Sequence, residues 1–310
     1  MALPAVSRRA AALDYPSRPV RIVVGFAAGG ANDLSARLMA QWLSDRLGQA
    51  FVVENRPGAG TNIAAESVVR AAPDGYTLLW LGTPAAVNAT LYPSLPFSIL
   101  RDIVPVGSVD RVPNVMAVHP AVPAATMPEF IAYAIANPGK LSMGSAGNGS
   151  LPHVAGVLFM MMTGVEMVHA PYRGEAPALT DLLGGHVQVV IGSVTATAPY
   201  ITAGKVRALA VTSTARSDML PDVPPLADFV PGYEATAWFG LGAPKSTPPD
   251  IVEKLNAEIN VALADAKMRE RFAALGCTVF PGTPAAFGAF LARETEKWGK
   301  VVRAANIQPD

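Results

Sequence analysis

The sequence predicts an α/β protein of two lobes with a cleft between them. Three observations predict this class. The chain has 310 residues, which suits two medium-sized units better than one core. Apolar runs typical of buried parallel strands alternate with amphipathic helical segments in two separate series. In each series a glycine-rich loop joins a strand to a helix, so we expect the two loops to face each other across the cleft.

The first series occupies residues 15–116, which we expect to form the first part of lobe 1. It opens with the nearly all-apolar strand "VRIVVGF". The helix that follows has apolar residues at helical spacing; we expect Asn32 or Asp33 to cap it and Gly48 to end it. The segments "FVVEN", "TNIAAESVVRAA" and "YTLLWLG" continue as strand, helix and strand. This alternation indicates a parallel sheet with right-handed crossovers.

The second series occupies residues 117–234 and predicts lobe 2. Helices alternate there with the strands "LSMGSA", "EMVHA", "VQVVIG" and "VRALAVTS". In residues 235–310, three helices surround the single strand "CTVF", which cannot form a sheet alone. We therefore expect this segment to return to lobe 1, so that the chain crosses between the lobes near residues 112–119 and 235–242. Trp238 and Phe239 are expected to pack at the second crossing rather than to line the cleft.

Composition argues against several classes of partner and cofactor. Lysine plus arginine and aspartate plus glutamate balance at 24 each, so no strong field recruits nucleic acid, and we expect no such partner. Cys277 is the only cysteine, which excludes an intrachain disulfide and a cysteine-cluster metal site. His119, His169 and His186 lack a second ligand at metal spacing, so we expect no metal site. No apolar run reaches 18 residues, and no membrane-spanning helix is expected.

The first 14 residues allow two interpretations. "MALPAV" followed by "AAA" is similar to the end of a secretory signal whose charged start and apolar middle are missing. A short disordered tail explains the same residues equally well. Residues 1–14 are therefore expected to be a signal remnant or a disordered tail.

The first glycine-rich loop, "FAAGGA", lacks the fingerprints of nucleotide-binding loops. A dinucleotide loop needs Gly-x-Gly-x-x-Gly, and a triphosphate loop needs Gly-Lys-Ser/Thr, but this loop has only the pair Gly29 and Gly30. Small residues before a helix still let main-chain N–H groups approach an anion, and the helix start adds roughly half a positive charge. A carboxylate suits this site. The alternative is that the two glycines only permit a tight turn.

The second loop, "GSAGNGSLPH", repeats the arrangement in the other series. Ser145, Asn148 and Ser150 offer hydrogen-bond donors, and the glycines expose main-chain N–H groups. His153 allows two interpretations: it donates to a ligand carboxylate, or it bonds to its own loop. Two such loops on opposite lobes predict a ligand site in the cleft.

Ordered blocks along the chain carry a family resemblance. They include "YPSRPVRIVVGFAAGGANDLSAR", "VENRPGAGTNIAAESVVRAAPDGYTLL", "GSAGNGSLPHVAGVLF", "HAPYRGEAPALTDLLGGHVQV" and "WFGLGAPKSTPPDIVEKLNAEI". In order and spacing they resemble the Bug family, the periplasmic solute-binding receptors of tripartite tricarboxylate transporters, from Tyr15 onward. The chain departs from many members at Gly25-Phe26-Ala27, where those members have a proline before the aromatic residue. The resemblance implies a two-lobed periplasmic binding protein-like fold of type II, a Venus flytrap, with two mixed, mostly parallel sheets flanked by helices.

The resemblance also implies how a ligand is held, because in the family the two glycine-rich loops grip a carboxylate through main-chain amides and bridging water. The first grip then consists of Ala27, Gly29, Gly30 and Asn32. The second consists of Ser145, Gly147, Asn148, Ser150 and His153. Tyr172 and Arg173 of "PYRG" match the loop after the next strand, and Thr83 and Pro84 are our candidates for contacting the distal part of the ligand.

The function implied by the resemblance is capture of a small organic acid or acidic amino acid in the periplasm and delivery to membrane subunits driven by an ion gradient. We expect a monomer that needs no cofactor. A ligand-sensing receptor with a signalling partner remains the alternative, since its lobes would look the same. An enzyme is disfavoured because no Gly-x-Ser-x-Gly motif is present.

Two further expectations concern charge near the loops. Arg37 stands one turn after Asp33 and is expected to pair with it along the helix rather than to clamp a ligand. Apart from Asp33, neither loop contains an acidic residue that would pair with an ammonium. A plain carboxylate is therefore favoured over an amino acid, with an aromatic monocarboxylate also open.

Overall fold

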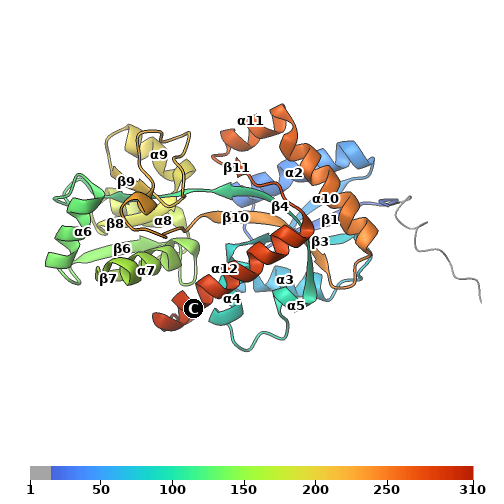
Figure 1. The fold of residues 1–310 in the computed structure, drawn as a ribbon, viewed down its shortest axis with the longest axis horizontal. Helices are drawn as coiled ribbons and strands as arrows, with labels where there is room; N and C mark the ends of the chain where they lie inside the picture. Colours follow the sequence, from blue (N-terminus) through green and yellow to red (C-terminus); the bar gives the residue numbers. More distant parts are fainter. Residues whose placement is uncertain (1–14, 310) are drawn as a thin grey trace, which may run out of the picture.

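The computed structural model describes residues 15–309 and has two lobes, each built on one mixed sheet flanked by helices (Figure 1). The lobe 1 sheet has the strand order β11-β4-β10-β3-β1-β2, and the lobe 2 sheet has the order β7-β6-β8-β5-β9. Within residues 15–309, no helix is long and apolar enough to cross a bilayer. The predicted class, two α/β lobes with mixed sheets, is confirmed.

Lobe 1 combines elements from both ends of the chain. Its strands are β1 (Val20–Val24), β2 (Phe51–Asn55), β3 (Thr77–Gly82), β4 (Ile103–Val112), β10 (Ala237–Pro244) and β11 (Thr278–Val279). Its helices are α2 (Ala31–Leu47), η1 (Ala59–Thr61), α3 (Asn62–Val69), α4 (Thr83–Leu91), α5 (Ile99–Asp102), α10 (Pro249–Ala264), α11 (Ala266–Ala274) and α12 (Pro284–Ala304). The β1 strand pairs in parallel with β2 and β3, as the alternating pattern predicts.

The returning strand β10 lies in the middle of the lobe 1 sheet, antiparallel to both β3 and β4. The sequence pattern did not predict β4 or β10 as strands, because glycine and proline interrupt both runs. Gly240 shows why glycine is needed there: a Cβ at this position would lie 2.4 Å from Cζ of Phe287 and 2.7 Å from the Gly107 carbonyl oxygen. Only a glycine lets β10 approach α12 and β4 so closely.

Lobe 2 is built from one continuous stretch of chain. Its strands are β5 (Asn114–Val118), β6 (Leu141–Ser145), β7 (Met167–Pro171), β8 (Val189–Ser193) and β9 (Arg207–Val211). Its helices are α6 (Met127–Ala136), α7 (Leu151–Thr163), α8 (Glu175–Leu183), α9 (Val194–Thr202) and η2 (Leu226–Asp228). The β6 strand is parallel to β7 and β8, and β5 is antiparallel to β8 and β9.

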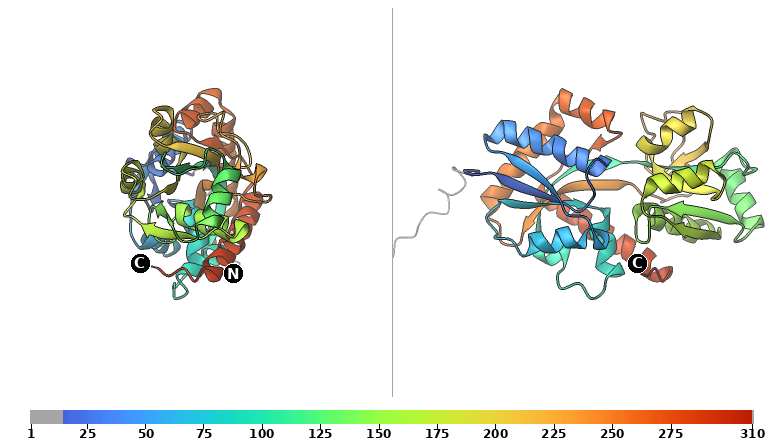
Figure 2. Two further views of the ribbon diagram at one scale, coloured as in Figure 1. Left: turned by 90° about the vertical axis from the view of Figure 1, so that its left-hand side faces the viewer. Right: turned by 180° about the vertical axis from the view of Figure 1, so that it is seen from behind.

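Two segments join the lobes, and both can be followed from behind in Figure 2. Only Pro113 separates β4 from β5, so the chain passes directly from one sheet to the other. The second segment leads into β10. The expected border after residue 116 falls inside β5, and we propose Pro113 as the border instead.

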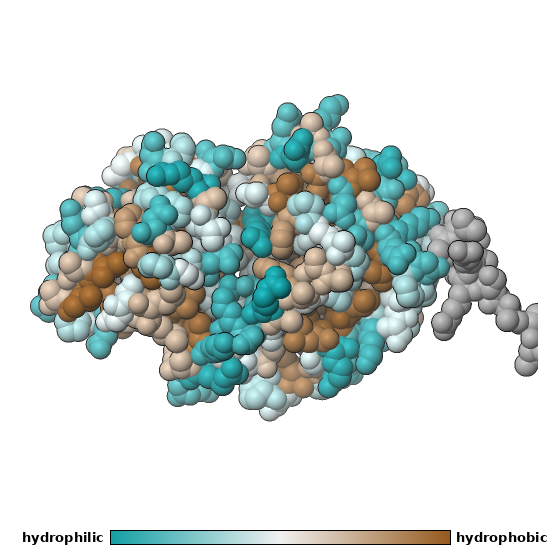
Figure 3. Space-filling model, in the orientation of Figure 1, coloured by the Kyte–Doolittle hydropathy of each residue, from teal (hydrophilic) through white to brown (hydrophobic). Residues whose placement is uncertain are grey.

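Helix α12 packs against α4 and β4 of lobe 1 and reaches α7 of lobe 2. Its inner face buries Trp298, and the indoles of Trp298 and Trp238 both donate to Oε2 of Glu294, at 2.9 and 3.1 Å. Its outer face carries Arg293, Glu296, Lys300 and Arg303, and forms the hydrophilic band that crosses the centre of Figure 3. This helix is therefore amphipathic and contacts both lobes.

Candidate ligand-binding cleft

The cleft between the lobes has a volume of about 420 Å³, within the range of small-molecule sites. Both lobes and both joining segments contribute to its walls. Lobe 1 contributes Phe26, Gly30, Asn32, Thr83 and Pro84; the joining segments contribute Val112, Asn114, Ala237 and Phe239; and lobe 2 contributes Ala146, Ser150, Leu151, Pro152, Gly174, Glu175 and Ser193.

In the part of the chain that the structure describes, five helices begin at the walls of this cleft. Gly30, Ser150, Gly174 and Ser193 are the N-cap residues of α2, α7, α8 and α9, and Thr83 is the first residue of α4. Each helix start carries roughly half a positive charge and N–H groups without partners inside the helix. The arrangement attracts an anion even though, among residues 15–309, no lysine, arginine or histidine lines the cleft.

The buried carboxylate of Asp33 holds the first glycine-rich loop in place. Oδ2 of Asp33 accepts from the Gly29 N–H and from Nε of Arg37, both at 2.9 Å. Oδ1 accepts from Nδ2 of Asn55 at 2.9 Å, and the same amide donates to the Phe26 carbonyl. Burial by itself raises the pKa of Asp33, but these three donors outweigh it, so the pKa lies below its usual value. The loop is thereby fixed at both ends.

This network tests two predictions about α2. The pairing of Arg37 with Asp33 along the helix is confirmed. The expectation that Asn32 or Asp33 caps the helix is wrong: α2 begins at Ala31 with Gly30 as its N-cap, and the Asp33 carboxylate turns back to the Gly29 N–H. Gly30 and Asn32 consequently face the cleft.

The second glycine loop uses most of its polar groups to hold its own shape. Oγ of Ser145 lies 2.6 Å from Nε2 of His169 and accepts from the Gly147 N–H, and the Ser150 hydroxyl donates to the Gly147 carbonyl at 2.6 Å. Nδ1 of His153 accepts from the Gly149 N–H at 3.2 Å. Ser145 is 1% exposed and His153 is 6% exposed, so both lie beneath the loop rather than on it.

The two histidine rings below the loop stack face to face. Their centroids are 3.6 Å apart and their planes differ by 7°. Burial, and secondarily the neighbouring His169, lower the pKa of His153 to about 4. His153 is therefore neutral at pH 7, which its acceptor role toward Gly149 requires. The geometry agrees with the interpretation in which His153 bonds to its own loop.

The other predicted ligand-binding residues fall into two groups. The cleft brings together Gly30, Asn32, Thr83, Pro84 and Ser150. The side chain of Thr83 is 2% exposed, and its Oγ1 has no hydrogen-bond partner among residues 15–309. The remaining predicted residues do not line the cleft, and their contact with a ligand stays a prediction: Ala27, Gly29, Ser145, Gly147, Asn148, His153, Tyr172 and Arg173.

Neither Tyr172 nor Arg173 of the "PYRG" loop lines the cleft. The Tyr172 hydroxyl donates to Oδ2 of Asp181 at 2.5 Å, and burial together with that carboxylate raises the pKa of Tyr172 to about 12. Arg173 is exposed. The residue of this segment that reaches the cleft is Glu175, two positions further on, which sequence reasoning missed.

Glu175 is the first residue of α8 and is held by the start of α9. One of its carboxylate oxygens accepts from the Ser193 N–H, and the other accepts from the Ser193 hydroxyl at 3.0 Å. Burial raises the pKa of Glu175, and the two Ser193 donors offset only part of that effect. The two glycine-rich loops contain no acidic residue apart from Asp33, as expected, but the cleft wall has one that lies outside them, Glu175. Phe239, expected at the hinge only, also lines the cleft, whereas Trp238 is buried against Phe287 and Phe290.

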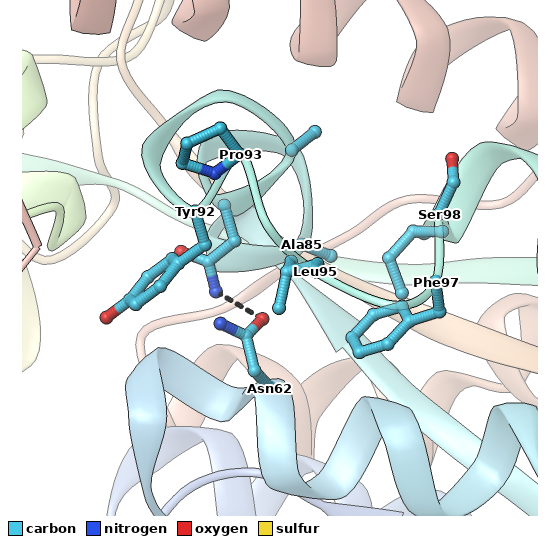
Figure 4. Close-up of a pocket in the computed structure, with 10 residues that line it drawn as sticks. Asn62, Ala85, Tyr92, Pro93, Leu95, Phe97 and Ser98 are labelled. Atoms are coloured by element: carbon cyan, nitrogen blue, oxygen red, sulfur yellow. Dashed lines mark hydrogen bonds between the residues drawn. The ribbon is translucent and has the colours of Figure 1, made fainter.

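A second, smaller cavity of about 100 Å³ lies within lobe 1, beside Asn62 and Tyr92 (Figure 4). Asn62 and Asn88 both line it, and Nδ2 of Asn88 donates to Oδ1 of Asn62 at 3.0 Å. Neither glycine-rich loop contributes to this cavity. The cleft between the lobes is therefore the candidate ligand site.

Comparison with known proteins fits this geometry. Residues 35–307 match the family model described as tripartite tricarboxylate transporter family receptor. The chain belongs to this family. Its members, the Bug-named relatives among them, are solute-binding receptors, and the resemblance of the sequence to the Bug family is confirmed.

Individual relatives of this receptor family cover nearly the whole chain. Protein BugT of Bordetella pertussis is 40% identical over 292 residues, which are 93% of this chain and 90% of that protein. The solved structure of R. palustris Rpa4515 with adipate is 37% identical, with a TM-score of 0.85, and covers 96% of this chain and 100% of its own. MatC from Rhodopseudomonas palustris with bound malate is 33% identical, with a TM-score of 0.79, and covers 93% and 100%.

Proposed function

We propose that this protein is a periplasmic receptor that captures a small carboxylate between its lobes, as a monomer, and delivers it to the membrane subunits of a tripartite tricarboxylate transporter. The observation that carries the proposal is the following: within residues 15–309, five helices begin at one cleft, and no basic side chain lines it. A carboxylate matches such a site because main-chain N–H groups and helix dipoles stabilise one negative charge. The adipate and malate bound by related structures support this ligand class.

The lobes give the proposal a mechanism without covalent chemistry. A ligand held by Gly30 and Thr83 on one side and by Ser150 on the other stabilises the form in which both walls touch it. Among residues 15–309 the Thr83 hydroxyl has no hydrogen-bond partner, so it is suited to bond such a ligand. The joining segments at Pro113 and before β10 are where the lobes can rotate, and the closed face is what the membrane subunits would recognise.

Isothermal titration of the purified protein with succinate, malate, adipate, nicotinate and benzoate tests this proposal. Gly30→Val is the informative variant: Gly30 has an extended backbone with φ −78°, and a Cβ there meets no atom within 4 Å, so the fold tolerates the side chain while the cleft loses room. We expect at least one acid to bind and Gly30→Val to abolish binding. Ala292→Val, at an exposed position on α12, is the control. An acid that binds both variants equally would contradict the cleft as its site.

A further inference from the structure

The positive helix starts in the cleft are not all available to a ligand. The starts of α2, α4 and α7 line the cleft at Gly30, Thr83 and Ser150. At the starts of α8 and α9, the protein's own carboxylate, Glu175, already accepts the Ser193 N–H. An internal anion thus occupies part of the anion-binding wall, and it does so on lobe 2.

The carboxylate of Glu175 belongs to the cleft wall and has acceptor capacity to spare. Two donors from Ser193 satisfy one lone pair on each oxygen, which leaves further acceptor positions. No ion pair formed within residues 15–309 includes Glu175, and it is the sole charged side chain that these residues place in the cleft wall. A largely buried carboxylate without a cation is costly, as the raised pKa of Glu175 also indicates.

The cleft is therefore polarised, with free positive helix starts on one part of its wall and a fixed carboxylate on another. Between these polar groups the lining is apolar, formed by Phe26, Pro84, Val112, Leu151, Ala237 and Phe239. A ligand that fits has a carboxylate, an apolar spacer and a group that donates hydrogen bonds to Glu175.

We infer that Glu175 is a specificity-determining residue that selects a carboxylate ligand carrying a cationic amine and rejects a second carboxylate. This inference rests on the proposed function, because it names the ligand class of the same cleft. An ammonium supplies the countercharge that Glu175 lacks, whereas the second carboxylate of a diacid meets a like charge in a partly desolvated site.

Matched pairs of ligands that differ in one end group test the inference. Dissociation constants are measured by isothermal titration at pH 7.5 for 4-aminobutanoate against succinate, 5-aminopentanoate against glutarate, and 6-aminohexanoate against adipate. The proteins are the wild type, Glu175→Gln, and Glu166→Gln as a control at an exposed acidic position of the same lobe. Glutamine is nearly the same shape as glutamate, and its amide oxygen still accepts from Ser193. The ratio of the two dissociation constants within a pair does not depend on the fraction of active protein.

For the chain length that binds best, we expect the amino acid to bind about tenfold tighter than the diacid in the wild type and in Glu166→Gln. In Glu175→Gln the ratio falls to about one or inverts. A diacid that binds the wild type as tightly as its amino partner, with the ratio unchanged in Glu175→Gln, overturns the inference and leaves the proposed function standing. If none of these ligands and none of the acids of the earlier panel binds, both are overturned.

Discussion

The two glycine-rich loops occupy equivalent places in the two lobes but are supported by opposite kinds of chemistry. In lobe 1 the support is a charged network around the buried carboxylate of Asp33, whose pKa is lowered by its three donors. In lobe 2 it is a network around the neutral ring of His153, which stacks on His169 beneath the loop. Similar backbone geometry can thus be fixed either by a charge that must stay ionised or by a base that must stay neutral.

The lobe 1 network should be the more sensitive to loss of a single residue. We expect Asp33→Ala to destabilise the protein by about 2 to 4 kcal/mol, because Gly29, Arg37 and Asn55 lose their acceptor in a buried site. Ligand affinity should fall with it, since the loop is no longer held at Gly29. Urea unfolding and titration of the bound acid measure the two effects. A variant as stable as the wild type would show that the loop does not depend on this carboxylate.

The contribution of the lobe 2 network to stability should depend on pH. The pKa of His153 is lowered from 6.5 to about 4 by folding, so the unfolded chain takes up the proton first as the pH falls. The stability from neutral His153 is complete above pH 6.5 and is lost as the pH falls toward 4, by up to about 3 kcal/mol. Urea unfolding between pH 4.5 and 7.5 should show this slope in the wild type.

His153→Gln provides the comparison, since a glutamine oxygen can still accept from the Gly149 N–H but does not titrate. The difference in unfolding free energy between the two proteins should shrink as the pH is lowered. Parallel curves over the whole range would contradict a role for His153 in acid sensitivity.

A pair of glycine variants tests whether the two loops have equal room. Gly149 has φ +69°, and a Cβ there would lie 2.3 Å from Cδ2 of Leu91 in α4 of lobe 1. We expect Gly149→Ala to cost about 1 to 2 kcal/mol, because the backbone is strained and the Leu91 side chain must move away. Gly30→Ala should leave stability within about 0.5 kcal/mol. Thermal unfolding of the two variants measures the loss of stability in each. A larger loss in Gly30→Ala than in Gly149→Ala would refute this account of the loops.

The smallest effect is expected at Arg37. Its side chain is about half exposed, and Asp33 keeps the Gly29 and Asn55 donors when Arg37 is removed. Arg37→Met should therefore cost no more than about 1 kcal/mol and leave ligand affinity nearly unchanged. A large loss of affinity would mean that Arg37 clamps the ligand after all.

The sequence predicted those parts of the molecule that depend on local pattern. Parallel strands such as β1 and β3 have continuous apolar runs, and Gly30, Thr83 and Ser150 could be placed because helix starts follow such strands directly. The strands β4 and β10 escaped prediction because glycines that permit close packing also erase the strand pattern.

Two features of the site that the sequence pattern does not give depend on contacts between distant positions. Glu175 reaches the cleft because Ser193, 18 residues later, holds its carboxylate. His153 lies beneath its loop because it stacks on His169 from the next strand. Neither pairing leaves a periodic signal in the sequence, so tertiary geometry was needed to find them.

The position of β10 bears on how the chain can fold. This strand spans Ala237–Pro244 yet fills the centre of a sheet whose other main strands end by Val112. As the chain is synthesised from its N-terminus, β3 and β4 lack the strand that lies between them, β10. More than a hundred further residues, including all of lobe 2, must be made before β10 is available. Lobe 2 can complete its sheet from a contiguous segment, whereas lobe 1 must wait for a contact of high sequence separation. The receptor would therefore remain only half folded during most of its synthesis, a state in which a chain can still be threaded across a membrane.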